Sequence, residues 1–259
     1  MMKTVFRSLG VAALVLSASV PAHAASSTFS WDPAAAGLAG AAFTADNLLL
    51  SDYLTVTNTS ASTFSEAGLL SITGAQLNGS VAATSGLNSS YGLYIAFSGT
   101  GVTSGGNPLT SVTTGSFTSL TFTLYGYNGT AAFGFAGTTP TTTAASPIAL
   151  ASGSLVNGSV VTLPTGGSFA PSSTATVSLD SIIAASFFSS PSPFYSLAQM
   201  SFTNTSSQVE LFANGFMIGN GGGTANFASP VPEPSTQLML LAGVGAIGWV
   251  ASRRRRAAA

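Results

Sequence analysis

The stretch Leu120-Thr121-Phe122-Thr123-Leu124-Tyr125 alternates large apolar residues with threonine and ends in a tyrosine. Successive side chains of a β-strand point to opposite faces, so this pattern is typical of a strand with one buried face and one face in water. Between residues 25 and 230 the chain is rich in Ser, Thr and Gly and lacks long apolar patterns with the helical period. The body of the chain is therefore predicted to be all-β.

Short β-rich runs extend this prediction along the body. They lie at residues 53–57, 68–77, 91–97, 119–127, 130–135, 148–155, 159–163, 174–179, 198–204 and 208–218. So many short strands favour a single-domain β-sandwich of jelly-roll type, or else an irregular barrel. The segment 179–188 is ambiguous, because Asp180, Ile182 and Phe187 fit a short amphipathic helix about as well as a strand.

Turns and loops are predicted from Asn-Gly pairs and from composition. Asn and Gly both tolerate positive φ, as the type I′ turns of hairpins require. The pairs at 128–129 and 157–158 lie between predicted strands, so each is expected to form a hairpin turn. Residues 138–146, rich in Thr, Ala and Pro, are predicted to form an exposed loop, and residues 219–234 a flexible linker.

The N-terminus has the three parts of a secretory signal peptide. Lys3 and Arg7 precede an apolar region at residues 9–20, and Ala22 and Ala24 then form an A-x-A cleavage site. An apolar region of about 12 residues is too short to span a bilayer comfortably, which argues against a permanent anchor. Residues 1–24 are therefore predicted to be removed, leaving a β-domain at 25–218.

The C-terminus is predicted to form a sorting segment that follows the linker. Pro232, Glu233 and Pro234 precede an apolar stretch at 238–251, and Arg253, Arg254, Arg255 and Arg256 follow it. The stretch is short but long enough for a thin or deformed bilayer, and the arginines should stay on the cytoplasmic side. Residues 235–259 are therefore expected to hold the exported protein transiently in the inner membrane through a short transmembrane helix.

This tail resembles the PEP-CTERM sorting signal of Gram-negative, biofilm-forming bacteria. The resemblance implies that exosortase, a membrane-embedded cysteine transpeptidase, recognises it, and that the protein passes to the cell surface or the exopolysaccharide matrix. The segments FSWD at 29–32, FTADNL at 43–48 and YGLYIAF at 91–97 are similar to flocculation-associated PEP-CTERM proteins. That second resemblance implies a role in floc or biofilm cohesion with extracellular polysaccharide.

The charged residues are distributed very unevenly along the chain. All Lys and Arg residues lie before residue 8 or after residue 252, the single histidine is His23, and there is no cysteine. Residues 25–230 carry six carboxylates and no Lys, Arg, His or Cys; the carboxylates are Asp32, Asp46, Asp52, Glu66, Asp180 and Glu210. Without a base or a thiol this region cannot build a catalytic triad, a Schiff base, or a His/Cys metal site. Without cations it is also a poor partner for nucleic acid. We therefore expect a non-enzymatic protein.

Three groups of residues remain as candidates for binding or chemistry. Asp32, Asp46 and Asp52 could supply oxygen ligands to calcium, the one cofactor considered, although their spacing also fits ordinary turns. Two of the six carboxylates could in principle serve a glycan hydrolase, but no motif selects a pair. Exposed aromatic rings could hold sugars, and the candidates are Tyr91, Tyr94, Tyr125 and Tyr127. The alternative to a cohesion protein is therefore a carbohydrate-binding, lectin-like module.

Overall fold

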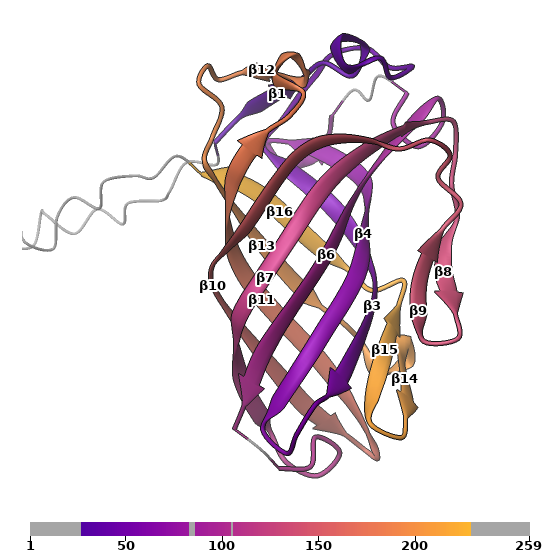
Figure 1. Cartoon of the computed structure of the whole chain (residues 1–259), viewed down its shortest axis with the longest axis vertical. Helices are drawn as coiled ribbons and strands as arrows, with labels where there is room; N and C mark the ends of the chain where they lie inside the picture. The colour runs from indigo at the N-terminus through magenta and orange to yellow at the C-terminus, as the bar shows by residue number, and fades with distance from the viewer. Residues whose placement is uncertain (1–26, 83–85, 105, 229–259) are drawn as a thin grey trace, which may run out of the picture.

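A computed structural model describes residues 27–82, 86–104 and 106–228 (Figure 1). The predicted signal peptide, with its cleavage residues Ala22 and Ala24, lies outside the described residues. So do the Pro-Glu-Pro motif, the apolar stretch and the arginines of the tail. Across the described ranges, no helix has the length and apolarity needed to cross a membrane.

The described chain consists of strands with three short 3-10 turns. In chain order these elements are β1 (Phe29–Trp31), η1 (Ala34–Ala36), β2 (Phe43–Ala45), β3 (Asn47–Asn58), β4 (Thr63–Leu77), β5 (Ser80–Val81), β6 (Tyr91–Thr103), β7 (Thr113–Asn128), β8 (Phe133–Ala136), β9 (Thr139–Thr142), β10 (Ile148–Thr165), β11 (Ser168–Ile182), η2 (Ala185–Phe187), β12 (Phe188–Ser190), β13 (Leu197–Thr203), η3 (Ser206–Gln208), β14 (Val209–Phe212), β15 (Gly215–Gly219) and β16 (Gly223–Ala228).

Eight strands form one antiparallel, barrel-like sheet (Figure 1). Their order is β3-β16-β13-β11-β10-β7-β6-β4, and β4 pairs with β3 from Asn47↔Gln76 to Asn58↔Phe64, which closes the ring. The all-β prediction is therefore confirmed. The jelly-roll sandwich is not confirmed, because β3 pairs on both sides and joins the strands into one ring in place of two facing sheets. The irregular barrel, left open by the strand count, is the nearer description.

The alternation that predicts the strands also fills the barrel. On β7, Leu120, Phe122 and Leu124 are buried while Thr121 is exposed. Strand β3 likewise buries Leu48, Leu50, Leu54 and Val56 on its inner face. Because apolar side chains of all the strands meet inside the ring, the hydrophobic effect favours closure of the sheet.

Smaller elements cover the barrel at one end and along its outside. A three-stranded sheet, β12-β1-β2, lies over the end at which β16 finishes (Figure 1). Its Trp31 is fully buried, and Phe227 of β16 lies against it with a ring-centroid separation of 5.7 Å. The β8–β9 hairpin lies on the outside and approaches β3, whereas the β14–β15 hairpin continues the sheet, because β15 pairs with residues 53–57 of β3 on the edge where β16 pairs with residues 48–50.

Neither Asn-Gly pair predicted to form a hairpin does so. Asn157-Gly158 lies inside β10, at an irregularity in its pairing with β11, so the two predicted strands at 148–155 and 159–163 are one. Asn128 ends β7, but the partner of β7 is β10, and the β8–β9 hairpin intervenes. The β10–β11 hairpin turns instead at Gly166 and Gly167, whose φ values of +58° and +95° suit a primed turn.

Two other segments differ from their predictions, and the ambiguous segment 179–188 is resolved mainly as a strand followed by a short 3-10 turn. The predicted loop at 138–146 contains β9, which pairs with β8, and the ambiguous segment 179–188 completes β11 and then forms η2. The predicted linker at 219–234 begins inside the barrel, because β16 pairs with both β13 and β3. Its glycines suggested flexibility, but Ala225 and Phe227 alternate into the core as strand residues do. The β-domain therefore extends to Ala228.

Gly153 of β10 is needed for the close approach of β11. A Cβ atom at residue 153 would lie 1.8 Å from the carbonyl oxygen of Ser178 and 2.6 Å from Cε1 of Phe122. We expect Gly153→Ala to lower the free energy of unfolding by about 3 kcal/mol, because a backbone atom cannot move aside without disturbing the ladder. Urea denaturation measures the change.

Gly74→Ala on β4 is the matched control for this prediction. Its Cβ would lie 3.4 Å from Cδ1 of Leu49, a side-chain atom that can adjust. We expect its unfolding free energy to stay within about 1 kcal/mol of the wild type. Equal losses of unfolding free energy for the two variants would show that the close approach of β11 to Gly153 does not cause the destabilisation.

Candidate functional site

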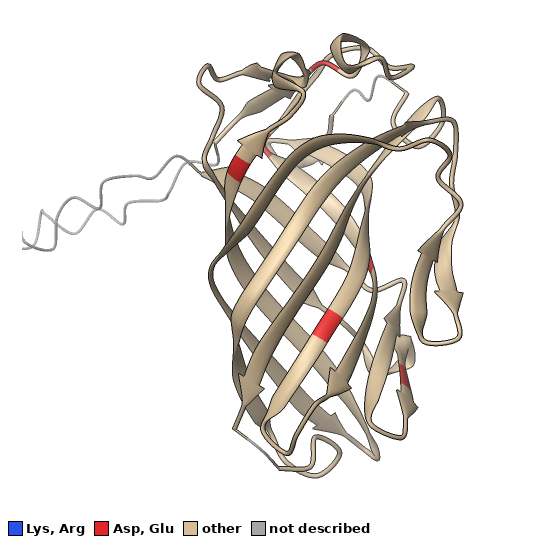
Figure 2. Ribbon diagram, viewed as in Figure 1, with Lys and Arg blue, Asp and Glu red and all other residues tan. Residues whose placement is uncertain are grey.

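The barrel presents no positive charge anywhere in the described ranges (Figure 2). Its six carboxylates are scattered over the molecule. Asp180 and Glu210 are exposed and Asp32 is half-buried. Asp46, Asp52 and Glu66 are buried, which is unusual because burying a carboxylate without a compensating partner is costly.

The three aspartates considered for calcium lie apart and serve local roles. Asp32 accepts a hydrogen bond from the amide of Ala35 at 3.3 Å, next to η1. Asp46 accepts one from the amide of Asn78 at 2.8 Å, where β4 turns into β5. Asp52 lies inside the barrel, and no three acidic side chains of the described ranges come close enough to share a metal ion. These aspartates therefore do not form one site.

Asp52 lies against the segment that connects β15 to β16, residues 220–222. Its Oδ2 accepts a hydrogen bond from Nδ2 of Asn204 at 3.1 Å, and Oδ1 of Asn204 accepts one from the amide of Gly222 at 3.1 Å. Oδ1 of Asp52 is buried without a hydrogen-bond partner. A Cβ at Gly221 would lie 1.9 Å from that oxygen, so only glycine fits at this position.

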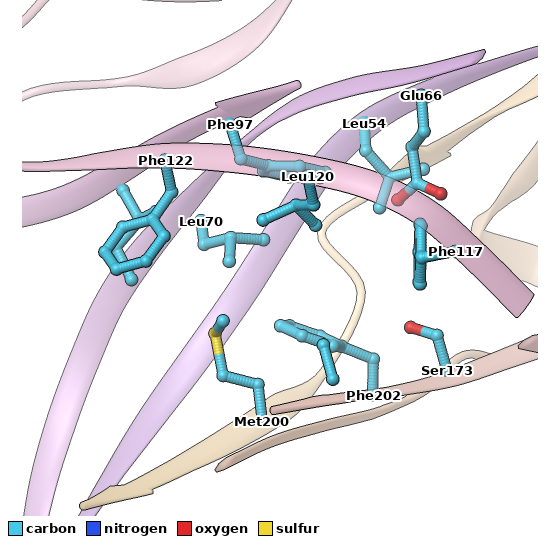
Figure 3. Close-up of a pocket in the computed structure, with 12 residues that line it drawn as sticks. Leu54, Glu66, Leu70, Phe97, Phe117, Leu120, Phe122, Ser173, Met200 and Phe202 are labelled. Carbon is cyan, nitrogen blue, oxygen red and sulfur yellow. The ribbon is translucent and has the colours of Figure 1, made fainter. Parts of the chain in front are cut away.

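Glu66 is the second carboxyl group of the barrel interior. It lies on β4 opposite Val56 of β3, and only 9% of its surface is exposed. Figure 3 shows its carboxyl group among Leu54 and Phe117, facing Ser173 across the interior. It makes no hydrogen bond with the described residues, so no neighbouring side chain compensates for the hydration that it has lost.

Burial raises the pKa of both carboxyl groups. The pKa of Asp52 rises to about 6, because desolvation outweighs the hydrogen bond from Asn204. The pKa of Glu66 rises to about 8 through desolvation and, to a smaller degree, repulsion from Asp52. At neutral pH, therefore, Glu66 mostly keeps its proton. The sequence contained a signal for this pair, because each residue occupies an inward position of an alternating strand.

The four tyrosines do not form an exposed platform. Tyr91 is fully buried in the core, and Tyr94 and Tyr127 are also buried. Tyr94 stacks on the half-buried Tyr125 at a centroid separation of 5.1 Å, and Phe133 of β8 meets it edge-on at 5.8 Å. These rings fix the β8–β9 hairpin to the outside of the barrel, which is the core-edge role of amphipathic aromatic residues.

Two rows of hydroxyl groups cross the outer face of the barrel, and sequence reasoning missed them. The pairing registers align one Ser or Thr from each of several neighbouring strands. The first hydroxyl row, on β6, β7, β10 and β11, consists of Ser98, Thr121, Ser154 and Ser178. The second hydroxyl row, on β7, β10, β11, β13 and β16, consists of Ser116, Ser159, Thr174, Ser201 and Thr224.

The hydroxyl rows make a polar surface of regular spacing. The first row is hydrogen-bonded to a carboxylate, because Asp180 accepts hydrogen bonds from Ser154 at 2.6 Å and from Ser178 at 2.5 Å. Neighbouring strands lie about 4.8 Å apart, so the hydroxyls repeat at that interval along each row. Ser159 and Thr174 hydrogen-bond each other at 2.9 Å, and Ser116, Ser159, Thr174 and Ser201 are all exposed. Because a hydroxyl group both donates and accepts, each row offers many similar hydrogen-bonding positions. Only the registers reveal the rows, because their members lie far apart in sequence.

Comparison with known proteins identifies the tail. The PEP-CTERM protein-sorting motif matches residues 230–256, a span that includes Pro232, Glu233, Pro234 and the four arginines. The match confirms the predicted sorting signal and implies that exosortase recognises the tail of an exported, membrane-transiting protein. No curated protein and no solved structure matches the chain.

Proposed function

We propose that this protein is a non-enzymatic component of the cell surface or the extracellular matrix, where it acts in floc or biofilm cohesion by binding exopolysaccharide. The observation that carries the proposal is the pair of hydroxyl rows, on an exported barrel without a described cation. Polysaccharides are rich in hydroxyl groups, which the rows can meet by donating and accepting hydrogen bonds. The regular spacing lets the barrel bind in many equivalent positions along a polymer.

The proposed contact is distributed over the surface and does not depend on a single pocket for one sugar. The lectin-like alternative needs a defined site, but the four candidate tyrosines pack against the barrel and the three candidate aspartates lie apart. The hydrolase alternative needs two carboxyl groups that flank one glycosidic bond. Asp52 is wholly buried against Asn204, so a polymer cannot reach it. These features favour adhesion over recognition of one glycan or its cleavage.

The hydroxyl rows can be tested by removing hydroxyl groups without adding charge. We expect the triple variant Ser159→Ala, Thr174→Val, Ser201→Ala to bind exopolysaccharide from the same culture about tenfold more weakly in a co-sedimentation assay. The reason is that several hydrogen bonds, each contributing about 1 kcal/mol, are lost together. A strain carrying this variant should also form fewer flocs.

The matched control removes the same number and kinds of hydroxyl groups from positions outside the hydroxyl rows. Ser62→Ala, Thr141→Val, Ser207→Ala also changes two serines and one threonine, and it also removes one hydroxyl–hydroxyl hydrogen bond, that between Thr205 and Ser207. We expect this variant to bind like the wild type. Equal binding by the two triple variants would contradict the proposal, as would cleavage of the polysaccharide by the wild-type protein.

A further inference from the structure

A cavity of about 500 Å³ opens into the barrel beside the β14–β15 hairpin. Strand β13 pairs with β11 only from Ser172 to Ser178, and the amide of Asn204 still donates to the carbonyl oxygen of Pro171, so residues 168–170 of β11 have a partner strand on the β10 side alone. The β14–β15 hairpin faces this gap, and Phe216 of β15 contacts Phe169 of β11 edge-on at 4.9 Å. The volume is within the range of small-molecule sites.

Most of the cavity wall is apolar, and one carboxyl group lies within it. Leu54, Val56, Phe64, Phe169 and Ile218 supply the apolar part, together with Phe216. Glu66 lines this cavity and also the narrow space of about 30 Å³ further inside the barrel. Its side chain is nine-tenths buried and has no hydrogen-bond partner among the described residues (Figure 3). The cavity therefore contains a polar group whose partner is not provided by the surrounding chain.

The charges around Glu66 decide which ligand chemistry fits. The other acidic group near it is Asp52 of β3, while Leu54, Phe97, Phe117 and Ser173 of the surrounding strands carry no charge. No described residue is a cation, so an anionic ligand would face the negative charge of Asp52 without a compensating positive charge. A neutral apolar ligand would leave the carboxyl group unpaired. An ammonium group would supply both the opposite charge and the hydrogen-bond donors that the site lacks.

We propose that the barrel cavity binds a small, mostly apolar molecule that carries one amine, with the ammonium group paired to the Glu66 carboxylate. In the free protein the carboxyl group holds a proton at neutral pH, so binding releases that proton to solvent while the ligand keeps its own. The charge in the site is then one carboxylate and one ammonium. Affinity should consequently increase as the pH rises from 6 to 8.

A head-group series at constant chain length tests this assignment. Decylamine, decanol and decanoate, each below its critical micelle concentration, are titrated into the purified exported protein by calorimetry at pH 7. We expect decylamine to bind at least tenfold more tightly than decanol, and decanoate to bind most weakly. Repeating the decylamine titration in buffers of different ionisation enthalpy should detect release of close to one proton.

Three variants separate a cavity site from non-specific binding. Glu66→Gln should bring the affinities for decylamine and decanol to within about twofold of each other and remove the proton release. Glu210→Gln, on the exposed β14 strand, should leave both unchanged. Ser173→Trp should fill the cavity and abolish binding of all three probes. Equal affinities of the wild type for decylamine and decanol, no binding by decylamine, or an unchanged preference in Glu66→Gln would overturn the proposal.

Discussion

Raising the pH from 5 to 9 should destabilise the wild-type barrel by several kcal/mol, with Glu66 as the main cause. Its pKa is about 8 in the folded state, compared with 4.5 for an unperturbed glutamate. Between these values the folded protein holds a proton that the unfolded chain releases, so stability falls as the pH rises. Each pKa unit corresponds to about 1.4 kcal/mol, which makes the full effect on the order of 5 kcal/mol. Urea denaturation at several pH values measures it.

The same experiment on Glu66→Gln identifies the group responsible. Glutamine has nearly the shape of the protonated glutamate and cannot ionise, so this variant should match the wild type at pH 5 to within about 1 kcal/mol. At pH 9 it should be the more stable protein by several kcal/mol. Asp52, whose pKa is about 6 in the barrel, should cause a smaller loss of stability than Glu66. This loss occurs in both proteins and is complete by about pH 7 as the pH rises. A wild-type stability that is constant from pH 6 to 9 would exclude a buried, unpaired Glu66.

Replacing Trp31 with alanine should lower the unfolding free energy by about 4 kcal/mol. Trp31 is fully buried, and its ring lies within 6 Å of Phe29, Phe43, Phe187, Phe188 and Phe227, measured between centroids. These rings come from β1, β2, η2, β12 and β16, so one side chain joins the small sheet to the barrel. Its removal would leave a large cavity, the costliest kind of core substitution.

Trp31→Phe is the control for the aromatic contact. The indole nitrogen has no hydrogen-bond partner among the described residues, so phenylalanine loses volume but no hydrogen bond. We expect it to cost less than half as much as alanine, as measured by urea denaturation followed by circular dichroism. A loss below about 1.5 kcal/mol for Trp31→Ala would mean that the small sheet adds little to the stability of the barrel.

The elements that sequence reasoning predicted well are those with a local cause. The alternation at residues 120–125 depends on burial of every second side chain, and the structure has a strand there with that face buried. Closure of the sheet has no local cause, because β3 pairs with β16, which lies more than 160 residues further along the chain. Turn residues were misleading for a related reason: Asn157-Gly158 suits a hairpin, but β7 and β11 flank it on both sides and hold it inside a strand.

The candidate sites divide in the same way. The sorting motif is continuous in sequence, so it could be recognised directly, and the family match confirms it. Asp52 and Asn204 are 152 residues apart in sequence, and they meet beside Gly221 in the segment that connects β15 to β16. The hydroxyl rows depend on five registers. The sequence indicates that hydroxyl groups are abundant and carboxyl groups rare, but it does not indicate which of these groups become neighbours in the fold.

The position of β16 links completion of the fold to the order in which the chain leaves the cell. The ring closes only when residues 223–228 insert between β3 and β13, so a chain exported from its N-terminus cannot finish the barrel until nearly all of the body has crossed. The matched sorting motif begins at residue 230, two residues after Ala228 ends β16. We therefore expect bulky additions at the end of β16 to hinder recognition of the motif by exosortase.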